Sequence, residues 1–406
     1  VYWSHSGVHR LLSLTAGVPL ADQLKDAFLR DSPVWMDTSS TESCRELEAL
    51  LGGSPVLASK TGSSAYERFS VHLIRASWKE IERNDCAAIS LVSSFGASLL
   101  KGEIAAVDWS DAAGMNLMDI QTKAWDPAIL NFAGLPPQEN STMLLQPVPS
   151  WKLLGRVSTF WQTTHGFSPE AQLVAWSGDN PCAVVGLGLL QEGDLAVSLG
   201  TSDTVMAVLS SPPADPLPFG HLFPHPLVDG LWFCMLCYTN GDLTRRRVRD
   251  QFASGSWEAF AQALAETAPF NGSCLAYYTT VPEITPPLAE ASSYLTWRGE
   301  CPADDFTAQE HVRAVIEMRA LAMKLHLSRM SASFAKQQQS QSRRLLLTGG
   351  ASGSAGIRQV FADVFQRPVT TQTSTEAAAI GAALRAMHAV TGQLPKQEGS
   401  VSEVPR

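Results

Sequence analysis

The chain alternates between helical and strand-like patterns of hydrophobic residues. Helical spacing predicts helices over residues 20–29 and 43–51, and a Gly-Gly pair after the second is a stop signal. Short apolar runs at residues 171–176 and 194–208 predict strands, and the second run reads as strand, turn and strand. Helices that alternate with short strands indicate an α/β architecture.

A long helix is predicted in the second half of the chain. Thr307 and Glu310 form a capping box, in which each side chain satisfies the backbone N–H of the other residue. Apolar residues then recur close to the 3.6-residue period, at positions 312, 315, 316, 320, 323, 327 and 330. We expect this stripe to be buried.

The region after this helix reads as strand, glycine-rich turn, helix and strand. The strand at residues 345–347 leads into Gly-Gly-Ala-Ser-Gly-Ser at 349–354, and a helix at 357–365 and a strand at 368–372 follow. After residue 168 the pattern changes to short apolar strands separated by turns, and we predict a domain boundary near residue 172.

A second capping box, Thr373 with Glu376, predicts a last helix that is rich in alanine. Gly381 lies inside it. A glycine there costs about 1 kcal/mol relative to alanine, so we expect another backbone to approach closely at Gly381.

The composition is that of a folded globular protein. The 406 residues suggest two or three domains, with 45% hydrophobic and 17% charged residues. A net charge of −9 argues against nucleic acid or an anionic membrane as a partner, because both need clustered cations. The short basic run at residues 245–249 is interpreted as a solvated helix face.

Seven cysteines are scattered without a framework spacing, which favours reduced thiols and a cytoplasmic protein. Cys234 and Cys237 form a C-x-x-C pair, but no second pair or His pair completes a zinc set. The flanking residues are apolar and strand-like, so we interpret this pair as core packing.

The turn at residues 199–203 is a candidate phosphate site. Gly200 can adopt backbone angles that a side chain forbids, so that successive N–H groups point into one concavity. The hydroxyls of Ser198, Thr201 and Ser202 flank it. An ordinary hairpin explains the same pattern, and the turn alone does not decide between the two.

The turn at residues 349–354 is a second candidate. No Gly-Lys-Ser/Thr follows it, so it is not a P-loop, and Gly350, Gly353 and Gly356 do not fit G-x-G-x-x-G. The missing fingerprint argues against a dinucleotide-dependent oxidoreductase. Glycines still allow a nucleoside to approach the backbone.

Three further residues are candidates for contacts with ligands. Asp179 could accept a proton from a substrate hydroxyl, or it could simply cap a helix beginning at Cys182. Arg68 could clamp a substrate, although a lone arginine is more often part of a structural ion pair. Trp257 could stack on a flat ring or be a half-buried aromatic.

Taken in order, nine segments resemble the FGGY family of carbohydrate kinases. They are Ser32–Asp37, Tyr66–Phe69, Ile89–Ser94, Asp108–Asp111, Ser177–Pro181, Ala196–Ser202, Glu283–Pro286, Thr348–Ser352 and Thr375–Ala379. They span nearly the whole chain in the order of the family, which makes the combination specific where single turns are not.

The resemblance implies two actin-like, RNase-H-like ATPase domains with a cleft between them. Residues 1–172 would belong to the sugar-binding N-terminal domain and residues 173–406 to the nucleotide-binding C-terminal domain. The implied reaction transfers the γ-phosphoryl group of ATP, with Mg²⁺, to a sugar hydroxyl, which for D-xylulose is the terminal one. Phosphoryl transfer asks mainly for positioning and charge neutralisation, with one carboxylate orienting the nucleophile.

The resemblance also assigns residues. Asp179 would be the general base, and Asn180 and Arg68 would contact the sugar. The implied nucleotide-binding residues are Gly200, Thr201, Ser202, Trp257, Gly350, Ala351 and Ser354, the last standing where an Asn is common in the family.

The chain also departs from the family. The opening phosphate- and magnesium-binding hairpin and a Gln-Gln-His-Gly stretch do not precede Val1, and a polar tail at 393–406 replaces the closing helix. Residues 70–73 depart from the Thr-Gly-x-Gln of the family. We therefore expect the first domain to be incomplete and the chain to be shortened at both ends.

Two functions remain open at this point. A sugar kinase whose sequence is cut short predicts ADP production by the extended protein. A non-catalytic relative, which binds nucleotide or a partner, predicts binding without turnover. The sequence gives no indication of the oligomeric state.

Overall fold

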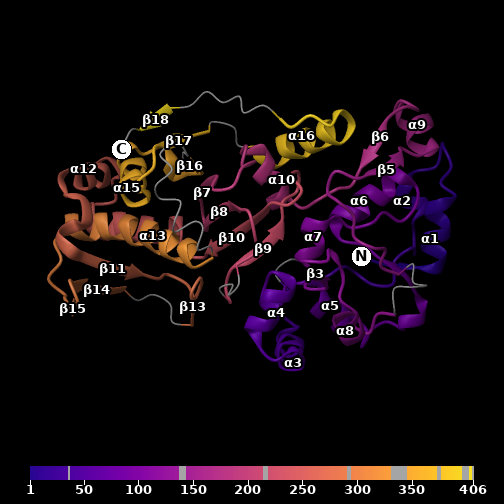
Figure 1. Ribbon diagram of the computed structural model, residues 1–406, viewed down its shortest axis with the longest axis horizontal. Coiled ribbons are helices and arrows are strands. Elements are labelled where there is room, and N and C mark those ends of the chain that lie inside the picture. Colours follow the sequence, from indigo (N-terminus) through magenta and orange to yellow (C-terminus); the bar gives the residue numbers. More distant parts are fainter. Residues whose placement is uncertain are drawn as a thin grey trace. The chain divides into compact units, whose positions relative to one another are not determined.

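The computed structural model describes residues 1–34, 37–136, 143–213, 218–289, 294–330, 345–372, 376–395 and 402–404. The chain forms two compact units, each built from separate segments (Figure 1). Unit 1 comprises Val1–Gly188, Leu222–Gly230 and Glu376–Lys396, and unit 2 comprises Leu189–His221, Leu231–Thr375 and Gln397–Arg406. The two compact units do not test the predicted division into domains 1–172 and 173–406, which stays a prediction.

Unit 1 is mainly helical with short antiparallel strand pairs. Its elements are β1 (Tyr2–Ser4), α1 (His5–Leu12), α2 (Leu20–Gln23), α3 (Thr41–Leu51), α4 (Ser54–Thr61), α5 (Ser70–Ser77), β2 (Cys86–Ile89), α6 (Val92–Lys101), α7 (Trp109–Ala113), β3 (Met118–Asp119), β4 (Ala124–Trp125), α8 (Pro127–Phe132), β5 (Leu153–Arg156), α9 (Thr159–His165), β6 (Gln172–Val174), α10 (Asp179–Gly186) and α16 (Ala377–Thr391).

The helix predicted over residues 20–29 is only partly formed. It ends at Gln23, and Asp26 adopts a left-handed φ of 59° that no α-helix allows. The carbonyl of Ala27 then accepts the N–H of Ser4 at 3.0 Å, and Phe28 bridges to Trp3. Pairing with β1 therefore overrides the local helical pattern. By contrast, α3 confirms the helix predicted at 43–51, and Gly52 caps it with φ 93°.

Helices α10 and α16 pack against each other, although residues 187–376 separate them in the chain (Figure 1). A Cβ added to Gly381 would lie 1.8 Å from the carbonyl oxygen of Cys182, and one added to Gly186 equally close to that of Ala377. The predicted backbone approach at Gly381 is confirmed. Of the predicted capping box, Glu376 takes the N-cap position but its side chain makes no capping bond to the helix, and Thr373 lies outside the described residues.

Unit 2 is built on a mixed sheet. Its elements are β7 (Leu195–Leu199), β8 (Asp203–Leu209), β10 (Trp232–Tyr238), α11 (Asp242–Phe252), α12 (Trp257–Glu266), β11 (Cys274–Tyr278), β12 (Glu283–Ile284), β13 (Pro287–Leu288), β14 (Tyr294–Arg298), β15 (Cys301–Pro302), α13 (Ala308–Met330), β16 (Leu345–Thr348), a 3₁₀ turn (Gly350–Gly353), α15 (Ala355–Phe365), β17 (Val369–Thr371) and β18 (Ser402–Val404). Strand β9 (His221–Pro224) begins in unit 2 and continues into unit 1.

The main sheet has the order β18-β17-β16-β7-β8-β10-β9. Strand β16 is parallel to both β7 and β17, whereas β8 is antiparallel to β7 and β10. The predicted strand, turn and strand at 194–208 is thus the β7–β8 hairpin. The α/β architecture and the elements predicted between residues 345 and 372 are confirmed.

Helix α13 confirms the predicted capping box and apolar stripe. The N–H of Thr307 donates to Glu310 at 2.7 Å, and the N–H of Glu310 donates to Thr307 Oγ1 at 3.2 Å. All seven predicted stripe positions are buried. The helix runs beside β11 and also packs on α15 (Figure 1).

Cys234 and Cys237 lie on β10 within this sheet and do not form a disulfide with each other. Burial raises the pKa of the Cys234 thiol to about 12, which leaves it unreactive. This confirms the interpretation as core packing for Cys234, whereas Cys237 is only partly buried. Across the described part of the chain, no helix is long and apolar enough to cross a membrane.

Candidate functional site

The β7–β8 hairpin presents an exposed turn. Leu199 and Asp203 form its last cross-strand pair, and Thr201 and Ser202 between them are exposed. Gly200 is not among the glycines with positive φ. The turn therefore does not use the left-handed backbone angles that favour glycine, and its shape has another cause.

That cause is the segment of Gly241 and Asp242, which contacts the turn. The N–H of Asp242 donates to the carbonyl oxygens of Gly200 (2.9 Å) and Thr201 (3.2 Å). A Cβ added to Gly241 would lie 2.5 Å from the Thr201 oxygen, so only a glycine allows this approach. The first turn of α11 thus holds two carbonyl groups of the hairpin.

A buried arginine, Arg245, forms further hydrogen bonds to the hairpin. Arg245 donates to both carboxylate oxygens of Asp203 (2.9 and 2.8 Å) and to the Gly200 carbonyl oxygen (2.9 Å). Its side chain is 5% exposed and that of Asp203 is fully buried. The interpretation of residues 245–249 as a solvated face is wrong for Arg245, because the carboxylate compensates its charge inside the protein.

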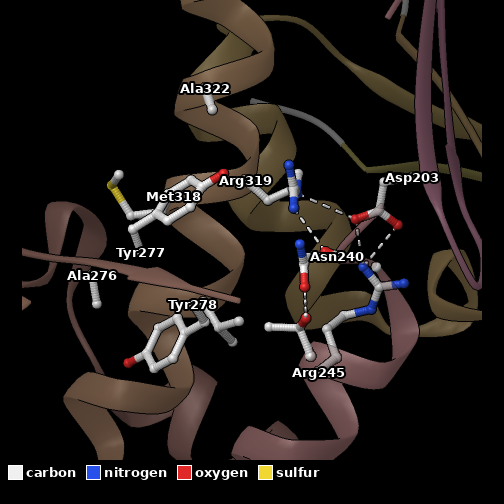
Figure 2. A pocket seen from close by; sticks show the side chains of 12 residues that line it. Asp203, Asn240, Arg245, Ala276, Tyr277, Tyr278, Met318, Arg319 and Ala322 are labelled. Atoms are coloured by element: carbon white, nitrogen blue, oxygen red, sulfur yellow. Dashed lines mark hydrogen bonds and ion pairs between the residues drawn. The ribbon is translucent and has the colours of Figure 1, made fainter. Parts of the chain in front are cut away.

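Two more charged residues, Arg319 and Glu283, extend this group, and Figure 2 shows Arg319 beside Asp203. Arg319 lies 3.4 Å from Asp203 and 3.4 Å from Glu283, and it donates to the Asn240 carbonyl oxygen at 2.7 Å. Burial raises the pKa of Asp203, and the two guanidinium groups oppose this rise. Burial would also raise the pKa of Glu283, but Arg319 and backbone N–H groups outweigh it and lower that pKa.

Asp203, Asn240, Arg245 and Arg319 line part of a partly open cavity of about 20 Å³. Figure 2 shows Asp203, Arg245 and Arg319 converging on it. This volume is the space of roughly one water molecule. The cavity is too small for a nucleotide, so it belongs to the support of the hairpin rather than to a ligand site.

The second glycine-rich turn lies beside the hairpin. In the parallel pairing of β7 and β16, Thr348 lies opposite Ser198, so both strands end at the same edge of the sheet. Gly349 has φ 82°, and a Cβ there would lie 2.5 Å from the Leu199 carbonyl oxygen. The structure therefore brings together the two turns that the sequence singled out separately.

Gly350 is exposed, and a Cβ built on it would meet no atom within 4 Å. Neither packing nor a positive φ requires glycine there, which leaves room for a ligand beside Gly350 and the half-buried Ala351. Ser354 caps α15 by accepting the N–H of Ile357 at 3.4 Å. Its hydroxyl thus already has a structural partner.

Trp257 lies farther away in the same unit. It begins α12, is 40% exposed, and packs with Arg249 over its ring at 4.8 Å. Arg249 is in the last turn of α11, whose first turn supports the hairpin. Eleven helical residues span ~16 Å, so a contact of Trp257 with a nucleotide base stays a prediction.

On unit 1, Asp179 lies at the start of α10. The helix begins at Asp179 itself, with Gly178 as N-cap, so the alternative in which Asp179 caps a helix from Cys182 is wrong. Asp179 accepts the N–H of Asn180 at 2.7 Å, and both side chains are exposed. The carboxylate is therefore accessible to a ligand.

Asp111 holds the backbone just before Asp179. It accepts the N–H of Gly178 at 2.9 Å and the hydroxyl of Ser93 at 2.5 Å. Burial and the neighbouring Asp108 carboxylate raise the pKa of Asp111 to about 7. The carboxyl group of Asp111 thus supports the loop that ends at Asp179.

Arg385 of α16 fastens the same region. It donates to the carbonyl oxygens of Ser150 (2.6 Å) and Ala175 (3.1 Å) and lies 3.7 Å from Asp108. Its side chain is 3% exposed. Arg385 also donates to Sγ of Cys182 in α10 at 3.4 Å. Helix α16 therefore supports α10 through a buried cation as well as through the close approach of the two glycines.

Arg68 is exposed in the loop between α4 and α5, with its guanidinium 5.3 Å from the centre of the Tyr66 ring. Its contact with a sugar, together with Asp179 and Asn180, stays a prediction.

Sequence reasoning missed the roles of Asp203, Glu283, Arg319 and Arg245. The sequence did contain one signal, since Asp203 directly follows the turn and begins an apolar strand. A carboxylate buried at such a position needs a cation as partner. Nothing local in the sequence indicates that the cations come from α11 and α13.

Sequence comparison identifies relatives for both halves of the chain. The model of the FGGY family of carbohydrate kinases, N-terminal domain, matches residues 15–186, and that of the C-terminal domain matches residues 195–390. Xylulose kinase of Mus musculus is 39% identical over 398 residues, which is 97% of this chain and 69% of the mouse protein. Xylulose kinase 2 of Arabidopsis thaliana is 38% identical, covering 98% of this chain and 72% of the plant protein.

Solved structures show the same fold. Xylulose kinase from Rhodospirillum rubrum aligns with a TM-score of 0.77 at 20% identity, over 91% of this chain and 73% of that chain. Glycerol kinase from Plasmodium falciparum, solved with ADP, aligns with a TM-score of 0.73 at 15% identity, over 90% and 71%. At these identities the likeness concerns the fold alone.

Proposed function

Because the chain belongs to the FGGY family of carbohydrate kinases, we propose that it transfers the γ-phosphoryl group of ATP to D-xylulose, forming D-xylulose 5-phosphate and ADP. The observation that carries this proposal is the 39% identity with mouse xylulose kinase over 97% of the chain. The exposed carboxylate of unit 1 and the paired turns of unit 2 supply the chemistry that such a transfer needs.

On the sugar side, Asp179 acts as the general base. It takes the proton from the terminal hydroxyl as that oxygen attacks the γ-phosphorus, and the bond to the β-phosphate oxygen breaks to release ADP. Its position at the first residue of α10 and its exposure support this role. Asn180 and Arg68 hold the other sugar hydroxyls through hydrogen bonds.

On the nucleotide side, Gly200, Thr201 and Ser202 hold the phosphates. The turn of Gly350 and Ala351 approaches the nucleoside, with Ser354 behind it at the start of α15. The proximity of the two turns at one edge of the sheet supports this assignment. Trp257 would contact the base.

Mg²⁺ enters the proposal as part of the nucleotide substrate. Among the described residues, no group of three or more His, Cys, Asp or Glu side chains could hold a metal ion. Bound to ATP, Mg²⁺ would neutralise phosphate charge, while the residues of the two turns position the nucleotide. The reaction takes place in the cytoplasm in this proposal.

The decisive experiment measures ADP release with D-xylulose and a panel of other ketoses and polyols. We expect D-xylulose to give the highest kcat/KM. Asp179→Ala should lower kcat by at least ~10²-fold, the usual contribution of a general base, while the Kd for ATP stays within twofold. Asp22→Ala, which removes an exposed acid of the same unit, is the matched control.

Two outcomes would overturn the proposal. Turnover retained in Asp179→Ala would remove the general-base assignment. ATP binding by the wild-type protein without ADP release on any sugar would favour a non-catalytic relative that binds nucleotide.

A further inference from the structure

The described residues of unit 2 contain a buried group of alternating charges. A contribution to the stability of the fold does not explain why these charges are buried. Glu283, Arg319, Asp203 and Arg245 form a chain in that order, and their side chains are at most 10% exposed. Removing charges from water costs about as much as such pairs return. A buried chain of this kind is better explained by the arrangement it fixes.

One end of the chain fixes the β7–β8 turn. Arg245 and the N–H of Asp242 hold the carbonyl oxygen of Gly200, and the same N–H also contacts that of Thr201. In a trans peptide the C=O of one residue and the N–H of the next point in opposite directions. The N–H groups of Thr201 and Ser202 therefore point away from α11, on the side where both residues are exposed.

The other end fixes the segment below the turn. Glu283 accepts the N–H groups of Thr239 (2.6 Å) and Asn240 (3.3 Å), and Arg319 donates to the Asn240 carbonyl oxygen. This segment leads directly into Gly241, which touches the Thr201 carbonyl group. Glu283 thus acts on the hairpin through two routes, by Arg319 to Asp203 and by the backbone to Gly241.

We infer that Glu283, Arg319 and Arg245 are positioning residues for the nucleotide phosphates: they hold the Gly200 and Thr201 carbonyl groups inward, so that the next two N–H groups face the phosphate. This inference rests on the proposed function of the hairpin and adds residues that do not touch the nucleotide themselves. The turn needs this support because a carbonyl oxygen that faced the phosphate would repel it. It also gives a role to the Glu283–Pro286 segment of the sequence.

The test compares two arginines of α13. Arg319→Lys keeps the charge but loses the fork that reaches Asp203, Glu283 and a carbonyl oxygen together. Arg313→Lys makes the same change at a buried arginine that bonds Glu317 and the carbonyl oxygens of Leu264 and Thr267. We expect Arg319→Lys to raise the Kd for ATP by about tenfold, the usual loss for a charged hydrogen bond.

In calorimetric titrations, Arg313→Lys should leave the Kd for ATP within twofold, and neither variant should change the Kd for D-xylulose. Equal effects of the two variants on ATP binding, or no effect of Arg319→Lys, would overturn the inference. A double-mutant cycle between Glu283→Gln and Arg245→Lys tests the continuity of the chain. The two residues are connected through Arg319 and Asp203, so a continuous chain predicts non-additive changes in Kd. Strict additivity would count against it.

Hydrogen exchange without nucleotide separates this inference from the proposed function. Arg319→Lys should speed the exchange of the amides of residues 199–203, and Arg313→Lys should not. Unchanged protection in Arg319→Lys overturns the positioning role whether or not the protein binds ATP. If the wild-type protein binds no ATP, the proposed function fails, and the exchange result alone decides the positioning role.

Discussion

Gly241 is the residue at which the support of the hairpin is tightest. A methyl group there would lie 2.5 Å from a backbone oxygen of the turn, which cannot move without breaking its bond to α11. We expect Gly241→Ala to lower the free energy of unfolding by roughly 1–3 kcal/mol and to raise the Kd for ATP. Urea denaturation and calorimetry measure the two effects.

Gly353→Ala is the control for this change, because a Cβ at Gly353 meets no atom within 4 Å. It should alter the free energy of unfolding by no more than the general effect of glycine, about 0.5–1 kcal/mol. Equal losses in the two variants would contradict the role given to Gly241.

The raised pKa of Asp111 predicts that the free energy of unfolding depends on pH. Its pKa in the folded protein is raised to about 7, above its value in the unfolded chain, so the folded state retains the proton longer. The free energy of unfolding should therefore fall as pH rises from about 4 towards 7. In Asp111→Asn, which keeps the acceptor for Gly178, this fall should be smaller.

The measurement is the difference in free energy of unfolding between Asp111→Asn and the wild-type protein, from urea denaturation at several pH values. We expect this difference to change in favour of the variant between pH 5 and pH 7.5. A difference that does not vary with pH would show that Asp111 does not titrate in this range.

Among the elements, the pair α10 and α16 gives the clearest test. In Gly381→Ala the new methyl group would collide with the carbonyl of Cys182 and push α16 away from the helix that begins at Asp179. Helix propensity alone would add ~1 kcal/mol of stability, so a net loss of roughly 1–3 kcal/mol measures the collision. We also expect kcat to fall with little change in the Kd for ATP.

Ala382→Gly on the same helix is the matched control. It should cost about 1 kcal/mol through propensity without changing kcat. An increase in stability in Gly381→Ala would mean that the two helices are not in close contact.

Local signals predicted the elements well where they act within one segment. The Thr307–Glu310 capping box and the stripe of α13 were correct because both depend on neighbours a few residues apart. The helix over 20–29 was only partly correct, because pairing with β1 decides the backbone at Ala27. Arg245 was misread for the same reason, since its partner Asp203 lies on another element.

The candidate site could be predicted only in part. The two glycine-rich turns were found from the sequence, but their proximity follows from the parallel pairing of β7 and β16, which no local pattern specifies. Gly200 does not adopt the left-handed angles that glycine allows, and its carbonyl oxygen is held by Arg245. Composition and spacing contain no information about such support from a distance.

For the whole molecule, the proposed division of labour predicts separate responses to the two substrates. ATP should slow hydrogen exchange in residues 199–203 and 349–354 of unit 2. D-xylulose should slow exchange in residues 177–182 and 66–69 of unit 1. Exchange measured with each substrate alone checks this, and protection of residues 199–203 by the sugar alone would contradict the assignment.

The return of α16 to unit 1 has a consequence for how the protein is made. The ribosome completes α10 early, but residues 189–375 must follow before α16 appears. At ~5–20 residues per second this takes roughly 10–40 s. During that interval the Gly186 side of α10 has no partner helix, so the segment that carries Asp179 is open to wrong contacts while the chain is still growing.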